Sequence, residues 1–209
     1  MITSPDGIES AGGVVGRVLR ASTTRFTVGC QQPMAAAGST LPAFGALVRA
    51  ENADGSVTYG LVSNITVEDD PFVRQLVAAG VENEEYIADQ RQRRQVPVVV
   101  DVLVVGWGNG PEIHHRLPPH PPGTLDRIYP CGPAEAVRFT GRHDWLRFVL
   151  AAADLPADAL AVAALRGAAQ ARPPDQRQGY LISAGRELAR LLAHDLTRLD
   201  GILQQIRNL

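Results

Sequence analysis

The chain has 209 residues, of which 45% are hydrophobic and 20% are charged, and its formal net charge is −2. This length and balance suit one large domain or two small ones with a packed core, and they argue against extensive disorder. The near-neutral charge excludes a global electrostatic attraction to nucleic acid, so any basic surface would have to be local.

All 20 basic side chains are arginines, and the sequence contains no lysine. The simplest interpretation is the codon bias of a GC-rich bacterial genome. The absence also has chemical consequences, because P-loop NTPases, protein kinases and Schiff-base enzymes each use a lysine. We therefore expect none of these three classes, and we assign no cofactor.

The two cysteines, Cys30 and Cys131, are far apart and belong to no CxxC pair. Such cysteines are typical of free thiols in a reducing compartment. The first residues show no basic segment followed by an apolar stretch, and no apolar run approaches the roughly 18 residues of a membrane span. We expect a cytoplasmic protein without a membrane segment.

Short apolar segments separated by turn signals fill the first half of the chain. After a flexible N-terminus at 1–12, the alternation predicts strands at 13–19, 26–30, 44–51, 56–66 and 96–105, with a loop at 31–43. Asn52-Ala-Asp-Gly55 is a strong hairpin signal, because Asp-Gly supplies the positive φ of a tight turn. Strands of this length and spacing are typical of a barrel or sandwich, so we predict a small β-barrel over 13–107.

Residues 69–94 predict a helical insertion in this barrel. Asp69 or Asp70 can cap a helix that has Pro71 at its first position, and Gly80 would end it. A second, polar helix is expected at 82–94. The nearly continuous apolar run Val96–Val105 then returns as a strand that is buried on both faces or lies deep in the barrel.

The second half of the chain predicts a different organisation. Residues 108–132 are rich in proline and are expected to form an extended linker. Residues 133–209 are expected to form a helical domain, with helices at 133–153, 157–170 and 176–208. The predicted fold class is therefore α+β: a small N-terminal β-barrel with a helical insertion, a Pro-rich linker and a mainly α-helical C-terminal part.

An apolar stripe runs along the last predicted helix and includes Leu188, Leu191, Leu192 and Leu199. These leucines are candidates for a partner interface or for contacts in a homo-oligomer. The alternative is that they form the core of the helical part. An acidic substitution at Leu192 distinguishes the two interpretations, because it would dissociate an oligomer in the first case and destabilise the monomer in the second.

One dense basic patch offers candidate phosphate contacts, namely Arg74, Arg91, Arg93 and Arg94. Four acidic residues lie just upstream, at Glu82, Glu84, Glu85 and Asp89. The alternative is therefore an exposed helix that neutralises its own charge.

Several groups of chemically capable residues lack the spacing of a known site. Two adjacent imidazoles, His114 and His115, rarely point the same way, so metal binding is the weaker interpretation. Cys131 lacks a defined base, and the His143-Asp144 pair lacks a serine in a nucleophile elbow. Glu68-Asp69-Asp70 suits helix capping better than a metal cluster. We assign no catalytic and no metal-binding residue. The large aromatics around the expected domain junction form either a binding hot spot or the packing between barrel and helices: Trp107, Tyr129, Phe139 and Trp145.

Three segments of the predicted barrel resemble a known family. They are Gly16-Arg-Val-Leu-Arg-Ala-Ser-Thr-Thr-Arg-Phe-Thr-Val, Phe44-Gly-Ala-Leu-Val-Arg-Ala-Glu and Tyr59-Gly-Leu-Val-Ser-Asn-Ile. Over residues 13–107 the chain is similar to the HAS-barrel, which is found at the N-terminus of HerA-type DNA translocases and in rotary ATP synthase subunits. The whole chain also resembles a group of uncharacterised bacterial HAS-barrel proteins of similar length.

The resemblance implies a barrel that docks onto a ring ATPase. HerA proteins continue into a RecA-like ATPase with a P-loop, and these 209 residues contain neither, so the motor activity is not carried over. We expect a non-enzymatic assembly or adaptor protein whose partner is a RecA-like ATPase in DNA processing. The alternatives are a nucleic-acid-binding module that uses the arginine patch and a metal-dependent hydrolase that uses His114, His115 or Cys131.

Overall fold

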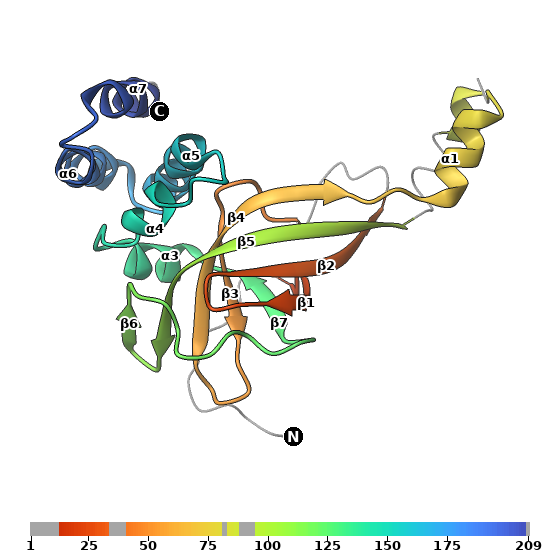
Figure 1. Cartoon of the computed structure of the whole chain (residues 1–209), viewed down its shortest axis with the longest axis horizontal. Helices are drawn as coiled ribbons and strands as arrows, with labels where there is room; N and C mark the ends of the chain where they lie inside the picture. Colours follow the sequence, from red (N-terminus) through yellow and green to blue (C-terminus); the bar gives the residue numbers. More distant parts are fainter. Residues whose placement is uncertain (1–12, 34–40, 81–82, 88–94, 208–209) are drawn as a thin grey trace.

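A closed β-barrel and a layer of helices make up the molecule, which confirms the predicted α+β class (Figure 1). The computed structural model describes residues 13–33, 41–80, 83–87 and 95–207. The expected flexible N-terminus at 1–12 therefore lies outside the described residues. None of the helices in the described ranges is long and apolar enough to cross a membrane.

The barrel has six antiparallel strands in the order β2-β1-β7-β3-β4-β5, and a long β2–β5 ladder closes it. Full closure pairs both edges of the sheet, which removes the exposed edge strands that promote aggregation. The strands are β1 (Gly16–Ala21), β2 (Arg25–Pro33), β3 (Leu47–Glu51), β4 (Val57–Val67), β5 (Gln95–Asn109) and β7 (Arg127–Pro130).

The barrel interior is filled by small, mostly β-branched side chains. Alternate residues of β5 point inward, and Val98, Val100, Val102 and Val104 are each at most 2% exposed. Phe26, which is 1% exposed, is the largest side chain of this cluster. The interior is a packed core, so binding surfaces of the barrel lie on its outside.

The strand β5 is buried on both faces from Val102 to Val105, whereas Pro97 is exposed and Val99 and Asp101 are partly exposed on the outer face. Its inward valines meet the barrel core, whereas Leu103 and Val105 point outward and join a second core beneath the helices. It pairs with β2 on one side and with β4 on the other.

The expected linker contributes to the sheet. Part of it, β6 (Glu112–His114), forms a hairpin with the end of β5, and β7 lies between β1 and β3 in the barrel. The barrel is therefore complete only at Pro130. A four-residue strand with a single buried apolar residue, Ile128, gives too little alternation for the sequence to predict it.

The loop expected at 31–43 is also shorter than predicted, because Gln31–Pro33 continue β2 against Gln95–Pro97 of β5. Conversely, the strand expected at 44–51 begins only at Leu47. Before it, Gly45 has a φ of 80° and lies where a Cβ atom would be 2.5 Å from Cβ of Ala163. A glycine is required there, because the barrel and a helix approach each other so closely.

Two of the three long C-terminal helices that the sequence predicts are each divided in two. The first becomes α3 (Pro133–Phe139) and α4 (Leu146–Leu150), whereas α5 (Ala157–Gln170) forms as expected. The last becomes α6 (Pro174–Leu191) and α7 (Leu196–Arg207). The break follows from Asp195, whose carboxylate accepts a hydrogen bond from the Arg198 amide at 3.0 Å and so begins a new helix.

The helices and the barrel share one hydrophobic core. Tyr59, Leu61, Leu103 and Val105 on the outer face of β4 and β5 pack in the same cluster as the buried side chains of the helices. Trp145 and Phe139, each 1% exposed, are the largest of these. A core on this scale holds the helical layer firmly against the barrel.

Candidate functional site

Four polar side chains form a row across the outer face of the barrel. Arg20 on β1 lies opposite Thr27 on β2. Thr27 lies opposite Asp101 on β5, which in turn lies opposite Asn64 on β4. The neighbours of Thr27 and Asp101 along each strand point into the barrel core, so strand alternation directs these two side chains outward.

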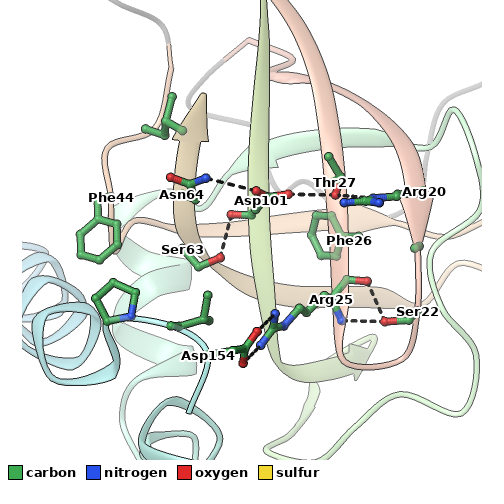
Figure 2. Close-up of a pocket in the computed structure, with 14 residues that line it drawn as sticks. Arg20, Ser22, Arg25, Phe26, Thr27, Phe44, Ser63, Asn64, Asp101 and Asp154 are labelled. Atoms are coloured by element: carbon green, nitrogen blue, oxygen red, sulfur yellow. Dashed lines mark hydrogen bonds and ion pairs between the residues drawn. The ribbon is translucent and has the colours of Figure 1, made fainter. Parts of the chain in front are cut away.

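Hydrogen bonds connect the row from end to end (Figure 2). Arg20 Nε donates to Thr27 Oγ1 at 3.2 Å, and Thr27 Oγ1 donates to Asp101 Oδ1 at 3.0 Å. From the other side, Asn64 Nδ2 donates to Asp101 Oδ2 at 3.4 Å. The Asp101 carboxylate is therefore held in place by one donor on each oxygen.

Two β-bulges lie beside this row. The register of β1 shifts between Val18 and Arg20, and that of β4 shifts between Val62 and Asn64. The extra residue of β4, Ser63, is 4% exposed and donates from Oγ to the Asp101 carbonyl at 3.1 Å. Because a bulge changes the direction of the side chains that follow it, the two bulges place Arg20 and Asn64 at the ends of the row.

The row forms one side of a pocket of about 820 Å³, whose other side is the segment before α5. Arg25 and Asp154 form a bidentate ion pair that ties the barrel to this segment. The pair raises the pKa of Arg25 and lowers the pKa of Asp154. Phe44, which is 36% exposed, adds an aromatic surface at the rim (Figure 2).

The pocket suits recognition of a polar group by hydrogen bonds. Arg20 uses only its Nε in the row, so its two terminal nitrogens remain available as donors. Asp101 accepts one bond on each oxygen and can accept more. The fixed acceptor Asp101 and the cationic donor Arg20 are separated only by Thr27 in the row, so the site fits a peptide backbone or a polar side chain of a partner.

Sequence reasoning missed this site, although one signal for it was present. Asp101 is the only charged residue in the apolar run Val96–Val105. A charge within an apolar strand requires partners. Those partners, Thr27 and Asn64, come from strands far away in the sequence and have no motif of their own.

The histidines and the cysteine proposed for metal or hydrolytic chemistry do not converge. His114 Nε2 lies 3.4 Å from Glu112, whereas His115 Nε2 hydrogen-bonds to the Phe139 carbonyl at 2.9 Å. Within the described ranges, no group of three or more potential ligands surrounds a common point.

Cys131 lies at the buried junction between barrel and helices, where burial raises the pKa of its thiol well above the usual range. Its neighbour Glu135 accepts hydrogen bonds from Tyr59 Oη at 3.0 Å and from Arg49 at 3.3 Å. This buried group ties α3 to β3 and β4. A thiol with a raised pKa is a poor nucleophile.

The structure places a serine beside His143. Ser183 Oγ on α6 lies 3.0 Å from His143 Nε2, and burial lowers the pKa of this imidazole. Asp144 instead lies 2.6 Å from Arg142 and 3.7 Å from His115 Nδ1. The sequence neighbours His143 and Asp144 therefore have different partners and do not form a triad with this serine.

The candidate phosphate contacts fall partly beyond the described ranges. Arg91, Arg93 and Arg94 lie outside them. Arg74 on α1 (Pro71–Ala78) is exposed and forms an ion pair with Asp69. This ion pair partly neutralises the charge of Arg74.

The four candidate interface leucines lie within the helical layer. Leu188 is fully buried and Leu192 is 3% exposed, and both belong to the core shared with the barrel. Leu191 and Leu199 are partly buried and pack against this core. This is the placement that the core interpretation of the stripe expects.

The four large aromatics divide between packing and surface. Phe139 and Trp145 are in the shared core. Trp107 is half-buried, with its ring centroid 4.6 Å from that of His114. Tyr129 lies below the Arg49 guanidinium, 5.5 Å from it.

An arm projects from the barrel on the strands that carry the polar row (Figure 1). We define the α1 arm as residues 66–80 together with the start of β5 at 95–97, because Val98 and Val100 belong to the barrel core. β4 and β5 remain paired at its base as far as Val67 and Val98, and α1 lies at its tip. Asp70 begins α1 by accepting hydrogen bonds from the amides of Phe72 and Val73, which confirms the predicted cap.

The α1 arm exposes apolar side chains at its tip. None of the residues of α1 is buried within the described chain. Val77 on α1 is 77% exposed, and Val67 at the end of β4 is 65% exposed. These two exposed valines make the tip of the α1 arm a candidate contact surface.

No protein-family model matches this sequence, and no curated protein sequence matches it. The closed antiparallel barrel is compatible with the barrel domain expected from the sequence.

Proposed function

We propose that this protein is a non-enzymatic assembly or adaptor protein that binds a partner protein through the α1 arm. The observation that carries the proposal is the exposure of Val67 and Val77 on a projecting, capped element. An apolar contact at the tip would bury these side chains, and burial of apolar area is the main favourable term in protein association.

The α1 arm is already folded before a partner binds. The β4–β5 ladder runs into it, and the Glu68 amide donates to the Pro97 carbonyl at 2.9 Å where the pairing of β4 with β5 ends. Because the element is already ordered, a partner would not have to supply the entropy of ordering it.

The polar row lies at the base of the α1 arm and adds specificity to this proposal. Asn64 and Asp101 belong to the same strands that lead to the tip. A partner that contacts the tip with apolar groups can therefore reach the polar pocket with a hydrogen-bonding group. A partner without that group would leave the polar side chains of the pocket partly desolvated and would bind less well.

The partner class comes from the resemblance of the barrel to HAS-barrels. It is a RecA-like ring ATPase of the HerA type, and the shared process is DNA processing in the bacterial cytoplasm. The closed barrel supports this proposal at the level of fold.

Affinity capture from the native host tests the proposal. The baits are the wild-type protein, Val77→Asp, and Gln75→Asp as a control that adds the same charge at another exposed position of α1. We expect a near-stoichiometric partner with the wild-type and Gln75→Asp baits, and its loss with Val77→Asp. Recovery of a RecA-like ATPase would support the proposed partner class. Equal recovery of a partner with all three baits would contradict the role of the α1 arm.

A further inference from the structure

We infer that a groove between the C-terminal helices binds an acidic amphipathic helix of a partner protein. The groove has a volume of about 570 Å³ and is formed by the end of α5, the first half of α6 and the end of α7. It lies at the opposite end of the molecule from the α1 arm (Figure 1). The inference goes beyond the proposed function and does not depend on it.

The floor of the groove is apolar. Leu181 and Ile182 contribute from α6, and Leu203 and Ile206 contribute from α7. Ile182 is 50% exposed, so a large apolar side chain is accessible there. Gly185 lies beside Leu203 without a side chain of its own, which keeps the floor open.

The rim of the groove is cationic. Arg166, Arg177 and Arg207 surround the floor, and the part of the lining that the structure describes contains no Asp or Glu. Arg177 is held in place by hydrogen bonds from its guanidinium to the carbonyls of Arg172 at 3.1 Å and Gln170 at 3.5 Å. Over the described ranges, Arg166 and Arg207 form no ion pair, so both charges are available to a ligand.

An acidic amphipathic helix matches both features. Its apolar side chains, at spacings of three and four residues, would fill the floor between the helices, and its flanking carboxylates would pair with the arginines. A second copy of this chain is a poorer occupant, because a symmetric contact through the groove would bring the arginines of both copies together. An anionic membrane also fits less well, since the apolar residues line a hollow between helices and do not form one face of a surface helix.

A designed peptide provides the probe. It is a labelled helix of about 16 residues, roughly 24 Å long, with leucine on one face and glutamate on both flanks. Two controls have lysine in place of glutamate, or glutamine in place of leucine. The protein variants are Ile182→Gln, the double variant Arg166→Gln/Arg207→Gln, and the control Arg186→Gln, which removes an exposed charge of α6 outside the groove.

Fluorescence anisotropy of the labelled peptides, titrated with the full chain, measures their affinities. We expect the glutamate peptide to bind at least about tenfold more tightly than either control peptide. Binding should weaken by a similar factor in Ile182→Gln and in the double arginine variant, but not in Arg186→Gln. It should also weaken as NaCl rises from about 50 to 300 mM.

Three outcomes would overturn the inference. One is equal binding of the glutamate and lysine peptides, and another is unchanged binding in the groove variants. The third is a concentration-dependent dimer, or association with anionic vesicles, that Ile182→Gln abolishes while the peptide does not bind. The variant Val77→Asp is expected to bind the peptide normally, so failure at the groove is distinguishable from failure at the α1 arm.

Discussion

The barrel interior and the junction between barrel and helices are both well packed, but they are built from different residues. The interior consists mainly of valines, with Phe26 as its largest member. The junction combines large aromatic and leucine side chains with buried polar groups, among them Arg49 and Glu135. The interior can be described by alternation along strands, whereas the junction depends on specific contacts between distant segments. The candidate binding surfaces accordingly lie outside both cores: on the outer face of the barrel, on the α1 arm and in the groove between the C-terminal helices.

The largest effect is expected in the interior. Phe26→Ala should lower the free energy of unfolding by about 4 kcal/mol, because it removes a fully buried ring and leaves a cavity. Phe44→Ala, at an exposed position, should cost less than about 1 kcal/mol. Urea titration followed by circular dichroism measures both, and similar losses would contradict the assignment of the barrel interior as a packed core.

A smaller but still large effect is expected at the junction. Leu192→Asp should destabilise the protein by about 3 kcal/mol, because it places a carboxylate in the shared core. Leu196→Asp is the control, since Leu196 is 69% exposed. Light scattering should give the same molecular mass for wild type and Leu192→Asp. A lower mass without destabilisation would instead assign the leucine stripe to an oligomer interface.

A pH-dependent loss of stability is expected from Tyr180. Burial raises the pKa of this phenol to about 12, from a usual value of 10.0. Its contribution to stability is therefore complete below pH 10 and is lost as the pH rises toward 12, by about 2 kcal/mol. The variant Tyr180→Phe should show a flatter stability profile between these pH values. Identical profiles for the two proteins would show that the phenol is not buried as described.

The smallest effect is expected in the polar row. Asp101→Ala removes the acceptor of Thr27 and Asn64, and we expect a loss of about 1 kcal/mol because both donors can turn to water at the pocket. Asp101→Asn retains an acceptor and should cost less. Thermal unfolding measures both variants, and a loss as large as that of Phe26→Ala would assign Asp101 to the core.

The sequence predicts much of the fold because its signals are local. The alternation in Phe26–Cys30, the Asp54-Gly55 turn and the Asp70 cap each determine the structure of their own neighbourhood. The sequence does not predict β7, because four residues carry little pattern and the strand is stabilised by partners from β1 and β3. It also leaves open what covers the leucine stripe, since amphipathicity shows which face is apolar and not what packs on it.

The candidate sites were the least predictable part. The polar row needs a barrel register and two bulges to bring Arg20, Thr27 and Asn64 to Asp101. The arginines of the groove come from three helices and have no common spacing. The exposure of Val77 depends on where the α1 arm projects, which no local pattern encodes.

The central claim is that the α1 arm is the partner-binding surface, and calorimetric titration of the captured partner tests it most directly. The wild-type chain, Gln75→Asp and the groove variant Ile182→Gln should bind with similar affinity, and Val77→Asp should bind at least about tenfold more weakly, because a charge would enter an apolar contact. Equal affinity of Val77→Asp and the wild-type chain would contradict the claim.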